Sequence, residues 1–345
     1  MRQRSGEARN QGQKGIFSLL IYFLVSLLPF LIQCPAFASN QPVVRPKIGL
    51  ALGGGGARGA AHIGVLRVLE RENIPIDYLV GTSAGALIAS LYSAGINPDK
   101  LEDYVLSGFI KRVYKTDLSL TRGIFLYMNK LTKTFFRKPF YAGLYNDHKL
   151  HRFVDDIITK EDGSIELVIP LHVLAVDLVS GLPVVIKSGD VGLAVQASTA
   201  IPALRQPIPI NDQLLVDGGV LKNIPVQEAK KMGADLVIAI DVDDKLELVK
   251  PQDFKSFEGV ITRVINLGLK AQSEHVLDKA DIVVSPDLSG VGILDLDEKS
   301  LLTAIKAGEE AAIEKLPDIK RMIELRSHEM KVASKTLKNK EEIKY

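Results

Sequence analysis

Apolar and polar residues alternate along the chain in segments that predict strands and helices in turn. An apolar run, KIGLAL (47–52), precedes a glycine-rich turn, and a stretch with apolar residues at helical spacing (57–71) follows that turn. A second short apolar run (77–80) leads into an Ala/Leu-rich stretch (84–94), with Gly95 where a helix C-cap is expected. Strands that alternate with helices indicate a parallel sheet covered by helices on both faces.

The same alternation resumes after residue 160 and extends the predicted sheet. We therefore expect a three-layer α/β fold with a mostly parallel central sheet. The last thirty residues are rich in lysine and predict a loose helix or a basic tail. Further strands are expected at 167–178, 182–187, 213–217, 234–241 and 281–286, and further helices at 193–198, 224–232 and 298–315.

Residues 98–160 interrupt the alternation of strands and helices and predict a helical insertion. Aromatic and cationic side chains are interleaved there, a combination that suits the surface of an anionic membrane. The same composition also fits a helical subdomain whose aromatic residues are buried and whose lysines are solvated. The aromatic residues are Phe109, Tyr114, Phe125, Tyr127, Phe135, Phe136, Phe140 and Tyr141, and the cationic residues are Lys111, Arg112, Lys115, Lys130, Lys133, Arg137 and Lys138.

The N-terminus has the order of a secretory signal. Cationic residues up to Lys14 precede an apolar run at 16–33 and the small-x-small pattern Ala36-Phe37-Ala38. We expect export with cleavage after Ala38, but the run is also long enough for an uncleaved membrane anchor, and both remain open. Cys34 is the only cysteine, and Gln33 before it is not the small residue that a lipoprotein signal requires.

Composition narrows the function classes. The chain has 345 residues, of which 46% are hydrophobic and 24% charged, and this is ordinary for a globular protein with a sizeable core. Its net charge of +2 and the lack of a zinc-finger or RNA-binding motif give no case for a nucleic-acid partner. The sequence has no HExxH, His/Cys cluster or EF-hand pattern, so no metal or other cofactor is expected.

The glycine-rich turn GGGGARG (53–59) fits two kinds of site. Gly54, Gly56 and Gly59 match the G-x-G-x-x-G pattern of dinucleotide-binding proteins. Those proteins need an acidic residue at the end of the second strand, whereas Asp77 lies at its beginning, and no Gly-Lys-Ser/Thr follows to make a P-loop. The other kind of site uses the backbone amides to stabilise the oxyanion of an ester under attack.

The pentapeptide GTSAG (81–85) favours an oxyanion site. G-x-S-x-G between a strand and a helix is a nucleophile elbow, whose sharp turn lifts the Ser83 hydroxyl above the sheet, with Gly81 and Gly85 avoiding clashes. Because neighbouring parallel strands end at the same rim, we expect the amides of Gly54, Gly55 and Gly56 beside Ser83 as an oxyanion hole. Arg58 either braces this loop, attracts an anionic head group or is merely solvated.

Asp217 is the best-placed base for Ser83. It ends the predicted strand 213–217, and Gly218 and Gly219 follow, so a tight turn would hold the carboxylate near the rim. An ordinary aspartate, with a pKa of ~3.9, is a poor base, so the site must make this carboxylate more basic. A plain Asp-Gly-Gly turn is one alternative, and a Ser-His-Asp site built on His275 is another. The remaining histidines lie in a helix, a strand, the insertion or a polar stretch: His62, His148, His151, His172 and His328.

In this order, the motifs resemble the patatin-like phospholipase family. The resemblance covers residues 46–290, includes ASTAIP (197–202) and NIPV (223–226), and is most similar to short bacterial members related to the neuropathy-target-esterase branch. The family's glycine motif matches Gly54, Gly55, Gly56, Arg58 and Gly59, its elbow matches Gly81, Ser83 and Gly85, and its Asp-Gly-Gly motif matches Asp217, Gly218 and Gly219.

The resemblance implies a Ser83–Asp217 dyad without histidine that hydrolyses fatty acyl esters of phospholipids or lysophospholipids, without calcium, at a membrane surface. It divides the chain into a signal peptide or anchor (1–38), a catalytic domain (46–290) and a C-terminal helix with a basic tail (291–345). A Ser-His-Asp carboxylesterase and a non-catalytic nucleotide- or lipid-binding module are the alternatives.

Overall fold

The computed structural model describes residues 45–108, 110–111, 148–202, 204–243, 245–246 and 248–342. They belong to one compact unit, Val44–Tyr345. The predicted signal or anchor segment and residues 112–147 of the predicted insertion lie outside the described residues, so their roles stay predictions. In the described ranges we find no helix with the length and apolar character needed to span a bilayer.

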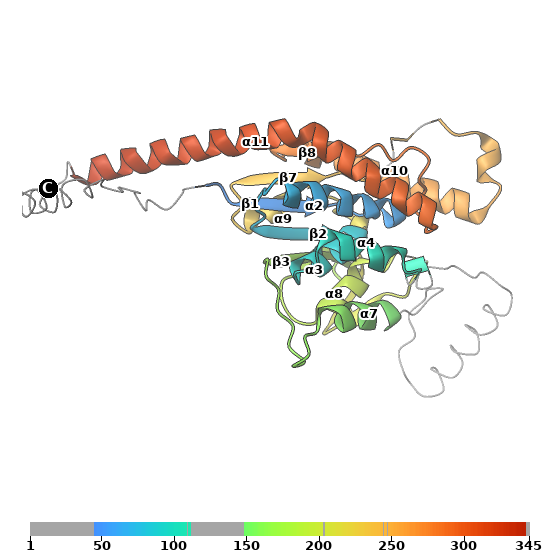
Figure 1. Cartoon of the computed structure of the whole chain (residues 1–345). Helices are drawn as coiled ribbons and strands as arrows, with labels where there is room; N and C mark the ends of the chain where they lie inside the picture. The colour runs from blue at the N-terminus through green and yellow to red at the C-terminus, as the bar shows by residue number, and fades with distance from the viewer. Residues whose placement is uncertain are drawn as a thin grey trace, which may run out of the picture. The chain divides into compact units, whose positions relative to one another are not determined.

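A central sheet forms the middle layer of the fold (Figure 1). Five neighbouring strands run parallel in the order β3-β2-β1-β7-β8, and antiparallel strands complete the sheet beside β3. The predicted three-layer, mostly parallel α/β class is therefore confirmed. The strands are β1 (Ile48–Leu52), β2 (Tyr78–Thr82), β3 (Leu171–Asp177), β4 (Leu182–Ile186), β5 (Ile208–Ile210), β6 (Gln213–Asp217), β7 (Leu236–Ile240) and β8 (Ile282–Val284).

Helices cover both faces of the sheet because its inner strands are apolar on both sides. In β1, Ile48, Leu50 and Leu52 pack with α2, α3, α4, α7, α8 and α11, whereas Ala51 packs on the other face with α9 and the end of α10. The helices are α2 (Ala61–Arg71), α3 (Ala84–Ser93), α4 (Pro98–Leu106), α7 (His148–Ile158), α8 (Val191–Ser198), α9 (Val226–Lys231), α10 (Phe257–Leu277) and α11 (Glu298–Glu342), with 3₁₀ turns η1 (Gly56–Ala60), η2 (Gly218–Val220) and η3 (Pro251–Phe254).

Strands β2 and β6 meet end to end along one edge of β3. Leu174 of β3 pairs with Thr82 of β2, and the next residue, Ala175, pairs with Asp217 of β6. Since β4 occupies the opposite edge of β3 at both positions, β2 and β6 must share the remaining edge. β2 is parallel to β3 and β6 antiparallel, so the two strands run toward each other and their last residues meet.

The C-terminal helix is longer than the sequence predicted. α11 continues from Glu298 to Glu342 and contains Pro317, whereas we expected a helix over 298–315 and then a loose helix or tail. Its first half packs on α2 (Figure 1). Glycines permit this close approach, because a Cβ on Gly64 would lie 2.0 Å from the Ile305 carbonyl oxygen and one on Gly308 would lie 2.0 Å from that of Ala61.

Candidate active site

Ser83 lies in the sharp turn between β2 and α3. Its backbone has φ 54° and ψ −121°, a conformation that costs a non-glycine residue about 1–3 kcal/mol. The flanking glycines have no room for a side chain, since a Cβ on Gly81 would lie 2.5 Å from Ala86 Cα and one on Gly85 would lie 2.3 Å from the Leu52 carbonyl oxygen. The turn therefore has the geometry of a nucleophile elbow.

The structure brings Ser83 and Asp217 into direct contact. The Ser83 hydroxyl donates a 2.6 Å hydrogen bond to Asp217 Oδ2, and the other carboxylate oxygen accepts the Gly219 amide at 2.8 Å. Both side chains are buried, although they come from positions 134 residues apart. The meeting of β2 and β6 on one edge of β3 explains how two residues so distant in sequence come to touch.

The segment 197–202 supports both residues from the side. Ser198 Oγ accepts the Ser83 amide at 2.8 Å, and the Ala200 carbonyl accepts the Asp217 amide at 3.0 Å. The sequence had indicated this ASTAIP stretch only through the family resemblance and gave Ser198 no role. Its position shows that the serine at the end of α8 holds the backbone of the elbow.

Burial raises the pKa of Asp217 from its ordinary value to about 6. The hydrogen bonds from Ser83 and Gly219 and the positive charge of Arg205 oppose the shift, but burial is the largest effect. A carboxylate with this pKa is a stronger base than an ordinary aspartate and is still ionised at neutral pH. Burial thus gives Asp217 the raised pKa that an aspartate needs to act as a base.

The glycine loop lies against Ser83. A Cβ on Gly54 would be 3.0 Å from Ser83 Cβ and 2.7 Å from Asn223 Oδ1. The amide of Gly54 is already engaged, because it donates to Asn223 Oδ1 at 3.1 Å. Within the described part of the chain, the amides of Gly55 and Gly56 donate to no acceptor, so these two groups are available to a ligand.

Asn223 fixes the glycine loop through its side chain. Besides accepting the Gly54 amide, it donates from Nδ2 to the Gly54 carbonyl at 3.2 Å and to Asp243 Oδ1 at 2.7 Å. Asp243 in turn accepts a hydrogen bond from Ser273 of α10. Sequence reasoning missed this role, although Asn223 begins the NIPV stretch that contributed to the resemblance.

Arg58 connects the same loop to helix α10. It is 1% exposed, and its Nη2 donates to Asn266 Oδ1 of α10 at 2.6 Å. The alternative that Arg58 is solvated is therefore wrong. His62 is also buried, and its Nε2 lies 2.8 Å from the Gly53 carbonyl. Burial lowers the pKa of His62 to about 4, so the ring is neutral and Nε2 donates to that carbonyl.

No histidine in the described ranges lines the space around Ser83. His275, the histidine of the Ser-His-Asp alternative, is exposed on α10. Among the residues that the structure describes, His151, Asp155 and Asp190 form the one group whose atoms could together hold a metal ion. His151 Nε2 lies 2.8 Å from a carboxylate oxygen of each aspartate, between α7 and the start of α8.

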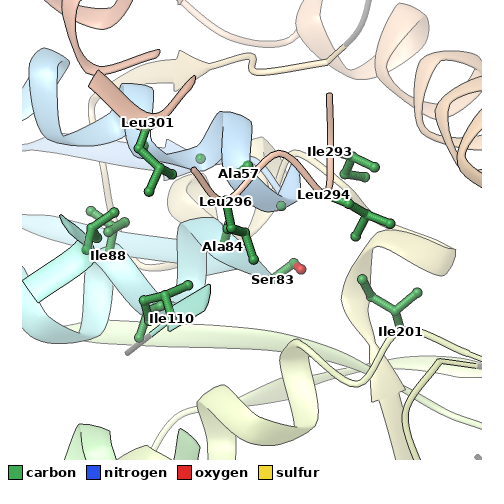
Figure 2. Close-up of a pocket in the computed structure, with 15 residues that line it drawn as sticks. Ala57, Ser83, Ala84, Ile88, Ile110, Ile201, Ile293, Leu294, Leu296 and Leu301 are labelled. Carbon is green, nitrogen blue, oxygen red and sulfur yellow. The ribbon is translucent and has the colours of Figure 1, made fainter. Parts of the chain in front are cut away.

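Two cavities open beside Ser83. The first is apolar apart from the serine and lies among η1, α3, α4 and the segment 293–301; Figure 2 shows Ile88, Ile110, Leu296 and other apolar side chains around it. The second, of about 300 Å³, contains Asp217 and the glycine loop and is bounded by α10. Ser83, Gly56, Ile201 and Ile293 line both cavities, so the serine hydroxyl stands where they meet.

Fold and site together define an α/β protein with a nucleophile elbow whose serine is paired with a buried aspartate. The profile of the family described as patatin-like phospholipase matches residues 50–230, which is more than half of the chain. The chain therefore belongs to the patatin-like phospholipase family, as its motifs predicted.

Known proteins resemble parts of this chain. Lysophospholipase NTE1 of Scheffersomyces stipitis is 33% identical over 195 residues, which are 56% of this chain and 12% of that protein. An uncharacterized NTE family protein of Mycobacterium bovis is 32% identical over 201 residues, which are 57% of this chain and 49% of that protein. The crystal structure of VipD from Legionella pneumophila is similar with a TM-score of 0.45 and 15% identity, over 79% of this chain and 67% of that chain. The chain thus matches less than half the length of both curated relatives.

Proposed function

We propose that the protein is a serine hydrolase that cleaves fatty acyl esters of phospholipids or lysophospholipids, with Ser83 and Asp217 as its catalytic dyad. The observation that carries this proposal is the 2.6 Å hydrogen bond from the Ser83 hydroxyl to the buried Asp217 carboxylate. Membership of the patatin-like phospholipase family and the similarity to a lysophospholipase support a lipid substrate.

In the first step, Ser83 Oγ attacks the carbonyl carbon of the ester while Asp217 Oδ2 accepts the hydroxyl proton. The free amides of Gly55 and Gly56 and the N-terminus of α3 stabilise the negative charge on the carbonyl oxygen. The bond to the alcohol then breaks, and the alcohol leaves with the proton from Asp217. In the second step, Asp217 takes a proton from water, which attacks the carbonyl carbon of the acyl-enzyme; the bond to Ser83 Oγ then breaks, Asp217 returns the proton to Ser83, and the fatty acid leaves.

Comparing wild type with Ser83→Ala tests the proposed function. We expect the wild type to release fatty acid from lysophosphatidylcholine or phosphatidylcholine in excess EDTA, because no step above uses a metal. Ser83→Ala should release none above background. Retained activity in Ser83→Ala would contradict the assignment of the nucleophile, and complete loss of wild-type turnover in EDTA would contradict the metal-independent mechanism.

The first cavity fits the acyl chain. It is narrow and apolar, and it starts at the serine hydroxyl (Figure 2). A fatty acyl chain gains free energy from leaving water at about 0.8 kcal/mol per CH₂ group, so a cavity of this composition would favour long chains. The second cavity, which carries Asp217, would hold the leaving alcohol and admit water.

Replacing Leu87, a buried residue of the first cavity, should change the preferred chain length. The larger side chain of Leu87→Trp would fill part of the cavity and exclude part of a long acyl chain. We expect the rate for a sixteen-carbon ester, divided by that for a four-carbon ester, to fall about tenfold, because losing the contacts of one methylene group costs about 1–3 kcal/mol. Leu325→Trp on the exposed side of α11 is the matched control and should leave the ratio unchanged. An unchanged ratio in Leu87→Trp would place the acyl chain elsewhere.

The raised pKa of Asp217 predicts the acid limb of the pH profile. Asp217 must be ionised to accept the serine proton, so protonation below pH 6 should remove activity. We expect kcat/KM for a soluble ester to be half its plateau value near pH 6 and to fall about tenfold for each further unit of acidity. An acid limb near pH 4 would show a base with an ordinary carboxylate pKa and would contradict this role for buried Asp217.

A further inference from the structure

Helix α10 buries polar residues and exposes apolar ones. Its buried side carries Asn266 and Ser273, which hold Arg58 and Asp243, beside the apolar Leu269. Its solvent side carries Val260, Val264 and Leu267, whose exposed fractions are 43%, 62% and 48%. A surface helix normally turns its apolar side to the core, so the buried polar residues serve the glycine loop and the exposed apolar ones need another explanation.

The exposed apolar residues form one continuous stripe. Their spacings of three and four residues place them on the same side of the helix, together with exposed Gly268 and Ala271. We call these five residues the α10 stripe: Val260, Val264, Leu267, Gly268 and Ala271. An exposed apolar strip of this kind marks a surface that meets another apolar surface.

The α10 stripe is continuous with the proposed active site. Val264 and Gly268 belong to the stripe and also line the cavity that contains Asp217. Gln272 of the same helix donates from Nε2 to the Gly219 and Val220 carbonyls, both at 3.0 Å, and Val220 is itself 41% exposed. An apolar path therefore leads from solvent along α10 to the Ser83–Asp217 pair.

The charges on α10 indicate what meets the stripe. Within the length of the stripe, residues 260–271, the charged residues are Arg263 and Lys270, both cationic and seven residues apart; the acidic residues of the helix, Glu258 and Glu274, lie beyond the two ends of the stripe. Helical spacing places them along one flank of the stripe, while the cavity-lining residues Ile265 and Gln272 lie toward the other flank. An apolar stripe bordered by cations is the arrangement of helices that lie in a membrane interface, where the cations reach phosphate head groups.

We propose that the α10 stripe docks the protein on an anionic lipid bilayer, so that the cavity with Asp217 opens onto the membrane. This inference rests on the proposed lipid hydrolase function, because a lipid leaving the bilayer needs an apolar path to Ser83. A protein partner or a second copy of the chain on the stripe would cover the mouth of the cavity. A bilayer covers the same residues and supplies the substrate through that mouth.

A single tryptophan reports docking independently of activity, because the chain contains none. We place it at Leu267→Trp, which belongs to the stripe but lines neither cavity, in a Ser83→Ala background so that vesicles stay intact. Vesicles of phosphatidylcholine and phosphatidylglycerol with brominated acyl chains should shift its emission to the blue and quench it. The matched control is Leu325→Trp, 53% exposed on α11, which should stay unquenched. Equal quenching at both positions, or none at 267, would overturn the proposal.

Introducing negative charge into the stripe gives the functional test. Val260→Glu/Leu267→Glu should lower hydrolysis of vesicle lipid at least about tenfold and change turnover of a soluble short-chain ester less than twofold. The control Leu325→Glu/Val332→Glu should keep both rates. Equal loss on both substrates, or a wild-type dimer that the stripe substitutions dissociate, would overturn membrane docking. Wild type without activity on any ester would defeat the proposed function, whereas the fluorescence result would still decide docking.

Discussion

Asp217→Asn should lower kcat/KM for ester hydrolysis about 10⁴-fold, as replacing a buried catalytic carboxylate by its amide does in serine hydrolases. The amide has nearly the same shape, and its oxygen can still accept the Gly219 hydrogen bond. Its nitrogen would face the Ser83 hydroxyl, however, and cannot take up the serine proton. The chemistry should therefore fail while the geometry survives.

Two controls separate this result from misfolding and from another base. Burial raises the pKa of Asp217 in the folded protein to about 6, whereas the same carboxyl has its ordinary pKa of ~4 in the unfolded chain. As the pH rises from about 4 to about 6, the unfolded chain gains ionised carboxylate before the folded protein does, so the free energy of unfolding of the wild type falls. Asp217→Asn has no such loss and should melt no lower than wild type at pH 7.5.

His275→Ala, on an exposed position, should be fully active. The opposite pattern, an active Asp217→Asn with an inactive His275→Ala, would establish the Ser-His-Asp alternative.

Gly54→Ala should lower kcat/KM about 10²- to 10³-fold, the usual cost of losing an oxyanion donor. The new methyl group would lie 2.7 Å from Asn223 Oδ1 and 3.0 Å from Ser83 Cβ, so the loop must move away from the serine. That movement carries the amides of Gly55 and Gly56 away from the position of the carbonyl oxygen.

A glycine outside the site provides the control for Gly54→Ala. Gly181 has φ +70° and open space around its Cβ position, and asparagine tolerates such a backbone. Gly181→Asn should therefore keep wild-type kinetics. If Gly54→Ala were as active as wild type, the glycine loop could not hold the oxyanion in the way proposed.

The elbow and the glycine loop could be predicted from the sequence because both depend on local chain geometry. In GTSAG, Gly81 is required by contacts with the next turn of chain and Gly85 by contacts with the end of β1, the strand that precedes the loop and pairs directly with β2. The motif order also predicted the family. Sequence reasoning could thus place Ser83 and the loop on one rim of the sheet.

The approach of Asp217 to Ser83 could not be predicted in the same way. We expected the end of strand 213–217 at the rim of a parallel sheet, whereas β6 runs antiparallel to β3 and meets β2 head on. Asn223 and Ser198 were missed for a related reason, since their roles depend on contacts 169 and 115 residues away. Strand direction and such long-range contacts leave no periodic signal in the sequence.

Helix α10 shows a second limit of pattern reasoning. An apolar side normally indicates the core, but α10 buries the polar residues Asn266 and Ser273 beside Leu269, and these two support the glycine loop. The sequence analysis predicted no helix at 257–277, where the structure has α10. The rule that a helix buries its apolar side fails in α10, next to the proposed active site, which is consistent with a functional role for this helix.

Covalent labelling tests the central claim most directly. A fluorophosphonate with a long alkyl chain reacts with an activated serine and cannot be released by hydrolysis, so mass spectrometry can locate the adduct. The Ser83–Asp217 dyad predicts one adduct, on Ser83, which forms at pH 8 in the wild type and at least about a hundredfold more slowly in Asp217→Asn. An adduct on another residue, or equal labelling rates in wild type and Asp217→Asn, would contradict the dyad.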